Sequence, residues 1–230
     1  KLSVGFVGPG KLGKIAAETI HKNHHCFGYD LYFDDPETSQ ERQDAVRSHT
    51  SSNLEGACED REIVLIAVQT PHHPDYDGRE PTSHLPPKDF NYEHIIKVVK
   101  DVDDRVNEGT IIAVISTMLP GTVREHIAPL VKRGRFVYNP YLIAQGTVEY
   151  DMENPEMIMI GTENGEEDDV VEKLYELYDP MVKEGTRFEI GTWEEIEATK
   201  VFYNTFISAK LGLVNMIQDV AMKVGHMNVD

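Results

Sequence analysis

The chain of 230 residues lacks the features that define several classes of protein. It contains only two cysteines, Cys26 and Cys58, so no disulfide framework is indicated and a reducing cytoplasm fits best. No apolar stretch approaches the roughly 18 residues of a membrane span, and no signal-peptide pattern precedes the first predicted strand. The 10 histidines include adjacent pairs, but no cysteine or acid spacing completes a ligand set. We therefore expect neither a membrane partner nor a metal site.

Basic residues are scarce relative to acidic ones. The 22 lysines and arginines face 40 aspartates and glutamates, which gives a formal net charge of −18. This charge argues against nucleic acid as a partner, because binding its phosphates needs a basic face. The apolar fraction of 40% and the chain length are typical of a globular protein with one domain or a domain and a half.

The start of the chain contains a glycine pattern between a predicted strand and a predicted helix. A nearly continuous apolar run at residues 2–7 is typical of a buried parallel strand, and residues 11–24 follow a helical pattern. Between them, Gly8 permits a tight turn, Gly10 a close approach to a pyrophosphate, and Gly13 helix packing, in the order G-x-G-x-x-G. The N–H groups at the helix start favour phosphate. The residues of this expected dinucleotide-binding turn are Gly8, Pro9, Gly10, Lys11, Leu12 and Gly13.

Asp30 follows a second predicted strand, at about residues 26–29. A carboxylate in this position accepts hydrogen bonds from both hydroxyls of a ribose. It would also repel a 2′-phosphate. Asp34 and Asp35 add negative charge nearby, and no arginine follows Asp30 directly. The sequence therefore predicts NAD rather than NADP as the cofactor.

Strand-like and helix-like segments alternate along most of the chain. Further strands are expected at residues 63–68, 111–115, 136–138, 157–160 and 187–190. Helices are expected at residues 37–47, 54–60, 92–106, 122–132 and 166–178. This alternation predicts an α/β fold, a doubly wound Rossmann-type sheet with helices on both faces.

A long loop at residues 69–91 follows the third predicted strand and carries five prolines and three histidines. It leaves the carboxyl end of a central strand, where open α/β sheets bind ligands. Two interpretations remain open: a mobile lid over the cofactor, or a surface excursion without a role.

The last segment predicts one long helix. Thr192 and Glu195 have the spacing of a capping box, and helix-compatible sequence without proline continues to Gly225. Its apolar residues cover nearly the whole circumference, which requires burial. Because little chain remains to bury it, we expect a partner subunit, further sequence, or both. We divide the chain into a dinucleotide-binding domain at residues 1–191 and a long helix at residues 192–230 that begins a helical dimerisation domain.

Two polar residues on that helix are candidate catalytic groups. Lys200 and Asn204 lie four residues apart and therefore on one helix face, with Glu197 one turn before them. One interpretation is a Lys200–Glu197 ion pair at the surface. The other is a positioned ammonium and amide that polarise a substrate oxygen during hydride transfer.

Two turns at the ends of central strands are candidate cofactor contacts. Residues 116–122, S-T-M-L-P-G-T, lie between a strand and a helix, and residues 68–71, V-Q-T-P, occupy the equivalent position one strand over. Their hydroxyls would lie beside the cofactor, although such residues are also ordinary turn and cap chemistry. The candidate cofactor-binding residues of these turns are Val68, Thr70, Pro71, Ser116 and Thr117.

The motifs follow one another in a characteristic order. They are Gly8 to Gly13, Thr70-Pro71, Ser116 to Thr122, Asn139 to Thr147, Asn154-Pro155 and Lys200 to Asn204. This order resembles the UDP-glucose/GDP-mannose dehydrogenase family over essentially the whole chain. The block N-P-Y-L-I-A-Q-G-T at residues 139–147 is its most specific part.

The resemblance implies a reaction, the oxidation of the C6 alcohol of a nucleotide sugar to a carboxylate, with two NAD per turnover and a cysteine-bound intermediate. It implies that Thr117 assists the cofactor or the catalytic water. Lys200 and Asn204 would hold and polarise the oxygen at the reacting carbon. The long helix, at residues 192–224, would be the interface of a homodimer. The residues expected to contact the substrate are Tyr141, Leu142, Gln145, Lys200 and Asn204.

The chain also departs from the family pattern. Tyr141 replaces the glutamate that usually follows Asn-Pro, and Gln145 replaces the acid before Gly-Thr, so negative charge and base capability are lost. The family's nucleophilic cysteine lies well after the long helix, and Cys26 and Cys58 are in the wrong places to replace it. We therefore expect this chain alone to bind NAD without completing the four-electron oxidation.

Two other functions remain open. The β-hydroxyacid dehydrogenases also pair an N-terminal Rossmann domain with Lys-x-x-x-Asn on a following helix. Their two-electron oxidation needs neither the cysteine nor a glutamate at position 141. The third hypothesis is an NAD-binding interaction module without catalysis. Residues 116–122 and 139–147 favour the nucleotide-sugar family.

Overall fold

A computed structural model describes residues 1–8, 10–144 and 146–228, and of Lys11 only the main chain. The expected cofactor residue Pro9 and the expected substrate residue Gln145 lie outside the described residues. The other candidate site residues all lie within the described ranges.

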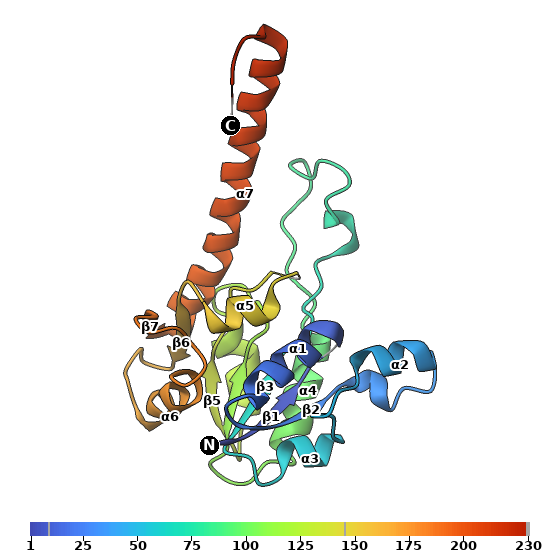
Figure 1. Cartoon of the computed structure of the whole chain (residues 1–230), viewed down its shortest axis with the longest axis vertical. Helices are drawn as coiled ribbons and strands as arrows, with labels where there is room; N and C mark the ends of the chain where they lie inside the picture. The colour runs from blue at the N-terminus through green and yellow to red at the C-terminus, as the bar shows by residue number, and fades with distance from the viewer. Residues whose placement is uncertain (9, 145, 229–230) are drawn as a thin grey trace.

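The described residues form a seven-stranded sheet in the order β2-β1-β3-β4-β5-β6-β7 (Figure 1). The strands are β1 (Ser3–Val7), β2 (His25–Tyr29), β3 (Ile63–Ile66), β4 (Ile111–Val114), β5 (Arg135–Tyr138), β6 (Ile158–Thr162) and β7 (Phe188–Thr192). Neighbours pair in parallel, except β5 and β6, which are antiparallel. The chain continues from β1 to β2 on one side and to β3 on the other, and such a reversal creates a ligand-binding crevice. The predicted doubly wound sheet is confirmed.

The last residues of five strands lie in one row across the sheet. They are the successive pairing partners Tyr29, Val7, Ile66, Val114 and Tyr138. All five are buried, as expected for strands covered on both faces. The loops that follow these strands therefore start at one level of the sheet edge.

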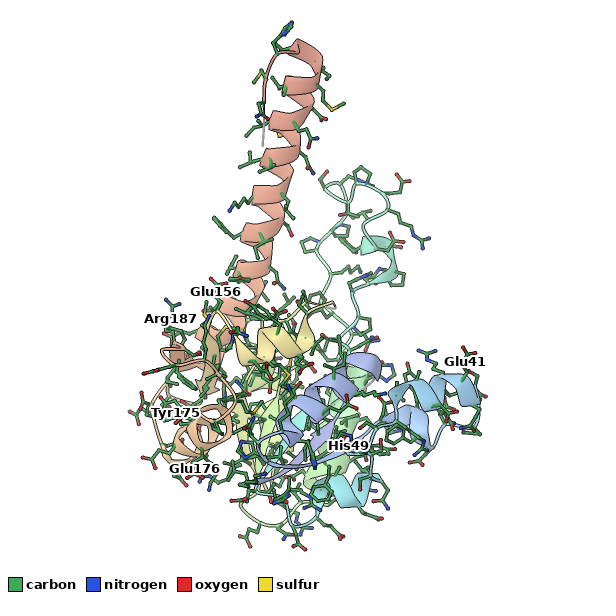
Figure 2. The ribbon with its side chains drawn as sticks, viewed as in Figure 1. Glu41, His49, Glu156, Tyr175, Glu176 and Arg187 are labelled. Atoms are coloured by element: carbon green, nitrogen blue, oxygen red, sulfur yellow. The ribbon has the colours of Figure 1, made fainter. Side chains whose placement is uncertain are left out.

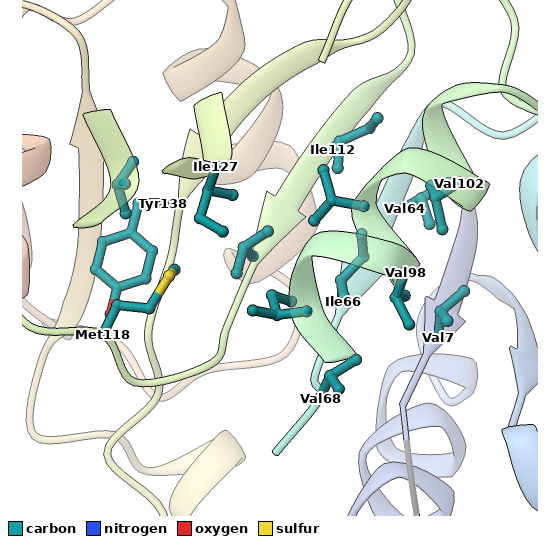
Figure 3. Close-up of a cluster of buried hydrophobic side chains, with 14 of the residues drawn as sticks. Val7, Val64, Ile66, Val68, Val98, Val102, Ile112, Met118, Ile127 and Tyr138 are labelled. Atoms are coloured by element: carbon teal, nitrogen blue, oxygen red, sulfur yellow. The ribbon is translucent and has the colours of Figure 1, made fainter. Parts of the chain in front are cut away.

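Helices cover both faces of the sheet, as predicted. They are α1 (Gly10–His21), α2 (Gln40–Val46), α3 (Leu54–Cys58), α4 (Glu93–Asp103), α5 (Val148–Glu153), α6 (Asp169–Tyr178) and α7 (Trp193–Val224). One hydrophobic core contains the inner sides of α1, α5 and α6, and the other contains those of α3, α4 and the start of α7. In Figure 3, Val98 and Val102 of α4 lie against the strands that carry Val64 and Ile66.

Two segments differ from the sequence prediction. The helix predicted at residues 122–132 is a π-helical turn, Val123–Ile127, followed by a 3₁₀ turn, Ala128–Leu130. Pro129 has no N–H to donate and its ring obstructs a continuous α-helix, which explains the break. The helix α5 was not predicted, because its six residues form less than two turns and give no readable periodicity.

Two segments project from the same end of the domain (Figure 1). The helix α7 runs from the capping box at Thr192 to Gly225, as predicted. The loop at residues 69–91 is closed at its base by a hydrogen bond of 2.8 Å from the N–H of Asn91 to the carbonyl of Pro71. The lid interpretation of this loop stays a prediction.

Large apolar side chains are exposed along most of α7. They include Phe202, Phe206, Leu211, Leu213, Met216, Ile217 and Val220. The expectation that this chain cannot cover the helix by itself therefore fits the structure. Among the described residues, no helix has both the length and the apolar character that crossing a bilayer requires.

A buried histidine connects the first strand to α6. The His24 side chain is 4% exposed, and its Nδ1 accepts a hydrogen bond of 3.2 Å from the N–H of Leu2. Its Nε2 is 2.7 Å from the carbonyl oxygen of Leu177, to which it donates. Both ring nitrogens are therefore used by the neutral form, and burial lowers the pKa of His24.

We predict that His24 makes the fold less stable in mild acid. Because its pKa is lowered in the folded state, unfolding takes up a proton below the ordinary pKa of 6.5. As the pH falls below this value, the free energy of unfolding should decrease by up to about 1.4 kcal/mol per pH unit. Denaturant unfolding of the wild type and His24→Gln between about pH 7 and pH 5 measures this slope. The variant should lose it, whereas the exposed neighbour control His25→Gln should retain it. Equal slopes in all three proteins would contradict the prediction.

Candidate active site

The glycine turn joins the end of β1 to the start of α1. A Cβ on Gly8 would lie 2.7 Å from the carbonyl oxygen of Ala67, and one on Gly13 would lie 3.1 Å from the carbonyl oxygen of Gly8. Both positions therefore need glycine for close packing. Gly10 differs, because its φ is +78° and a Cβ there would meet nothing within 4 Å. Open space beside the main chain of the turn is what the approach of a pyrophosphate requires.

Asp30 lies beside this turn, directly after β2. The residue is 4% exposed, and its carboxylate accepts hydrogen bonds from the N–H of Tyr32, at 2.9 Å, and from the N–H of Gly10. Burial raises the pKa of Asp30, and the two N–H donors oppose that rise. The structure thus brings the acid expected at a ribose next to the turn expected at a pyrophosphate.

The loops after β3 and β4 are joined by hydroxyl groups. The Ser116 hydroxyl accepts from the N–H of Val68 at 2.9 Å and donates to the carbonyl of Val68 at 2.6 Å. The Thr70 hydroxyl donates to the carbonyl of Thr117 at 2.7 Å. These two hydroxyls therefore hold the loops together. Within the described residues the Thr117 hydroxyl has no hydrogen-bond partner, so of the three it remains available to a ligand.

Lys200 lies one turn beyond Glu197 on α7, but the two side chains have different partners. Lys200 is 8% exposed, and its ammonium donates to the carbonyl of Tyr141 at 2.7 Å. The Glu197 carboxylate accepts from the N–H groups of Gly121 and Val123, each at 2.7 Å. The Lys200–Glu197 surface pair considered from the sequence was wrong, because main-chain groups of two other segments satisfy both side chains. Burial lowers the pKa of Lys200.

The side chain of Tyr141 lies against α6. Its hydroxyl shares a hydrogen bond of 2.8 Å with Tyr178, and the Tyr178 hydroxyl donates to the side-chain oxygen of Asn139. The two tyrosine rings meet edge to face, 6.2 Å apart. Tyr141 was expected to contact the substrate. Its hydroxyl is instead used within the protein, and its carbonyl faces Lys200.

A cavity of about 810 Å³ lies over the carboxyl ends of β1, β3 and β4. Lys200 and Tyr141 form part of its wall. The residues expected to bind the cofactor that line it are Leu12, Gly13, Val68, Ser116 and Thr117. Thr70 and Pro71 line an adjoining cavity of about 900 Å³, which shares Val68 and Thr117 with the first. The start of α1 and the loops after β3 and β4 therefore meet along one cleft.

Another cavity, of about 780 Å³ and called the second cavity below, adjoins the cleft of about 810 Å³ at Lys200 and Ile143. Leu142 and Asn204, both expected to contact the substrate, line it. The Asn204 side chain is exposed and makes no hydrogen bond within the described part of the chain. Lys200 thus separates a cleft that holds the candidate cofactor residues from a cavity that holds candidate substrate residues.

Three polar residues of the second cavity were not predicted from the sequence: Asp151, Glu156 and Tyr203. The Tyr203 hydroxyl donates to the carboxylate of Glu156. Figure 2 shows Glu156 beside the place where α7 leaves the domain. Asp151 accepts from the hydroxyl of Thr147 at 2.7 Å. Only Tyr203 carried a readable signal, because it lies three residues after Lys200 and so on the same helix face.

The comparison with protein families agrees with this geometry. The model of the NAD-binding domain of the UDP-glucose/GDP-mannose dehydrogenase family matches residues 33–179, more than half of the chain. The chain belongs to this family. The UDP-glucose 6-dehydrogenase of Rickettsia prowazekii is 26% identical over 148 residues, which cover 63% of this chain and 33% of that enzyme. The resemblance stated from the sequence is confirmed.

Solved structures share the fold. A GDP-mannose dehydrogenase from Pseudomonas aeruginosa superposes with a TM-score of 0.75 at 22% identity, covering 97% of this chain and 54% of that one. A UDP-glucose dehydrogenase from Pyrobaculum islandicum superposes with a TM-score of 0.74 at 19% identity, covering 98% of this chain and 54% of that one. This chain therefore spans about a third of the curated relative and about half of the solved structures.

The cofactor of the matched family domain is NAD, and the residues present fit it. Gly10 leaves the space that a pyrophosphate needs, and the carboxylate of Asp30 lies directly beside the Gly10 N–H. An acidic side chain at position 30 suits NAD, because a carboxylate accepts hydrogen bonds from the ribose hydroxyls. Gly8 to Gly13, Asp30 and the loops after β3 and β4 would hold the cofactor.

We predict that Gly10→Ala separates cofactor binding from folding. Alanine is strained at a φ of +78°, by about 1–2 kcal/mol, but it meets no neighbour. Its Cβ would fill the space expected for the pyrophosphate, so NADH affinity should fall by more than about tenfold. Energy transfer from the single tryptophan, Trp193, to NADH measures binding, and denaturant unfolding measures stability. The control Gly212→Ala, on exposed α7, should bind NADH like the wild type. Unchanged affinity in Gly10→Ala would contradict the prediction.

Proposed function

We propose that this chain is the NAD-binding and lysine-bearing part of a nucleotide-sugar dehydrogenase. The observation that carries the proposal is the position of Lys200. Its buried ammonium lies at the boundary between the cleft of the glycine turn and the cavity that contains Asn204. A hydride acceptor and an alcohol placed on the two sides of this residue would meet beside a fixed positive charge.

The side chains around this boundary have complementary roles in the proposal. When bound, NAD supplies the hydride acceptor. Lys200 and Asn204 hold the substrate oxygen, whose proton passes to solvent, and the Lys200 charge stabilises the negative charge that develops on this oxygen. The free hydroxyl of Thr117 orients the cofactor or a water molecule at the wall of the same cleft. The carbonyl of Tyr141 directs the Lys200 ammonium.

The charge of the second cavity favours a sugar over a small hydroxyacid. Asp151 and Glu156 line it, and in the described lining Lys200 is the one basic side chain. The carboxylate of a hydroxyacid would need a further cation to offset these acids. Sugar hydroxyls, in contrast, donate hydrogen bonds to carboxylates and accept them from the Asn204 amide. The nucleotide-sugar reading is therefore preferred to the β-hydroxyacid alternative.

The cysteines of this chain do not supply the nucleophile for a second oxidation step. Cys26 and Cys58 are free and buried, and burial raises the pKa of both to about 12. Neither is therefore a thiolate near neutral pH. Oxidation of the alcohol as far as the carboxylate would therefore need a nucleophilic thiol other than those of Cys26 and Cys58.

The remaining parts of the proposal concern organisation. We assign residues 1–191 to the NAD-binding domain and residues 192–230 to the start of a helical dimerisation domain. The exposed apolar side chains of α7 support a homodimer formed through residues 192–224. The free thiols of Cys26 and Cys58 are compatible with the cytoplasm.

We predict that the protein binds NADH at least about tenfold more tightly than NADPH, because Asp30 repels a 2′-phosphate. Asp30→Asn should weaken NADH binding and narrow the difference between the two cofactors. Titration with each cofactor, followed by Trp193 energy transfer, measures both affinities. Glu41→Gln, which removes an exposed carboxylate in the first turn of α2, should keep the wild-type preference. Tighter binding of NADPH by the wild type would contradict the assignment of NAD.

The catalytic part of the proposal predicts that Lys200→Met lowers turnover at least about 100-fold, since the charge on the substrate oxygen loses its stabilising partner. NADH affinity should change by less than about threefold. The first, two-electron oxidation of UDP-glucose and of GDP-mannose is followed by NADH absorbance. Lys210→Met removes an exposed lysine from the same helix and should have no effect. Near-normal turnover in Lys200→Met would refute the role of Lys200.

A further inference from the structure

Glu197 is a fully buried carboxylate near the start of α7. Its Oε2 accepts from the N–H of Gly121 and its Oε1 from the N–H of Val123, each at 2.7 Å. Burial raises the pKa of Glu197, but these N–H donors favour the charged form. Both oxygens are therefore used to join α7 to the loop after β4, more than 70 residues earlier in the chain.

This junction lies between two residues of the candidate active site. On α7, Lys200 follows Glu197 by three residues, about one helical turn. On the loop, Thr117 precedes Gly121 by four residues. Thr117 and Lys200 both line the cleft of about 810 Å³. The separation of these two walls is therefore set through Glu197.

The other contacts of the loop do not replace this link. The hydrogen bond from Thr70 to the carbonyl of Thr117 fixes the loop to the β3 side, away from α7. Arg124 pairs with Glu194 on α7, but both side chains are partly exposed, and they join side chains rather than main chain. Among the described residues, Glu197 makes the hydrogen bonds between the main chain of this loop and α7.

The geometry points to Glu197 as a positioning residue that holds Thr117 and Lys200 at the separation needed for hydride transfer. This inference rests on the proposed function. Two charge-assisted hydrogen bonds to main-chain N–H groups define the position of the loop better than a flexible side-chain pair does. Gly121 contributes through its φ of +94°, which allows its N–H to face the carboxylate. Glu197 touches neither cofactor nor substrate in this role.

A carboxylate is required because two N–H groups must be accepted at once. A glutamine offers one oxygen, and its NH₂ group would face the second N–H, so one hydrogen bond is lost. A displacement of about 1 Å at a reacting group lowers a rate by up to about 100-fold. Glu197→Gln should therefore reduce kcat while leaving the KM for NAD, which the glycine turn and Asp30 dominate, nearly unchanged.

The experiment compares the wild type with Glu197→Gln, Glu197→Asp and the matched control Glu194→Gln, at temperatures where each is folded. We expect Glu197→Gln to lower kcat at least about tenfold with a change in the KM for NAD below about threefold. Glu197→Asp keeps both acceptor oxygens and the charge, so its kcat should lie between those of Glu197→Gln and the wild type. It is the deciding variant if Glu197→Gln does not fold. Glu194→Gln should stay within about twofold of the wild type.

Two further readouts separate positioning from loss of structure. Amide hydrogen exchange at Gly121 and Val123 should accelerate in Glu197→Gln and remain unchanged in Glu194→Gln. In the wild type, kcat should fall on the acid side as Glu197 is protonated, and the Gln variant should lack that limb. Accelerated exchange with wild-type kcat would overturn the positioning role. Parallel losses of kcat, NAD affinity and folded fraction would reduce Glu197 to a structural residue and overturn it as well.

The failure of this inference can be distinguished from failure of the proposed function. If the wild type binds no NADH and releases none with UDP-glucose or GDP-mannose, the proposed function is refuted and the positioning role with it. If the wild type is active and Glu197→Gln has the same kcat and the same pH profile, only the inference about Glu197 is refuted.

Discussion

The parallel register of the central strands is the constraint on which the site depends. Val7, Ile66 and Val114 pair in one row, so the glycine turn and the loops after β3 and β4 begin at the same level. Only then can the Ser116 hydroxyl bond both main-chain groups of Val68 on the neighbouring loop. A slip of one residue would turn each side chain to the opposite face of the sheet and separate these groups. The cleft is thus a consequence of strand pairing before any ligand is considered.

Three charged side chains are buried at or beside this edge, and each is satisfied by main-chain groups. Asp30 and Glu197 accept N–H groups, whereas Lys200 donates to a carbonyl. An unpaired buried charge is costly, so such partners are required for folding. Main-chain dipoles reduce that cost without cancelling the charge, as an ion pair would. The site therefore keeps a negative group at the glycine turn and a positive group at the boundary of the two cavities.

Local patterns predicted much of this arrangement, and contacts distant in sequence account for the rest. The glycine turn, the position of Asp30 and the capping box at Thr192 each depend on residues close together, so the sequence alone indicated them. The partner of Glu197 could not be predicted in this way, because it lies on a loop more than 70 residues away. An ion pair with Lys200 was the nearest local alternative, and the distant N–H groups replaced it. The direction of Tyr141 likewise depends on α6, which follows it in the chain.

Tyr141 affects the two steps of the proposed reaction, hydride transfer and hydrolysis, in different ways. Tyr141 contributes no carboxylate, because its hydroxyl is bonded to Tyr178 within the protein. Its carbonyl still directs the Lys200 ammonium, and a neutral carbonyl leaves the full positive charge of that group available. Stabilising negative charge on a substrate oxygen needs this cation but no base at position 141. Hydrolysis of a covalent intermediate needs a base to activate water. In the proposed function, the arrangement around Lys200 therefore serves the hydride-transfer step, and any later hydrolytic step draws its base from another residue.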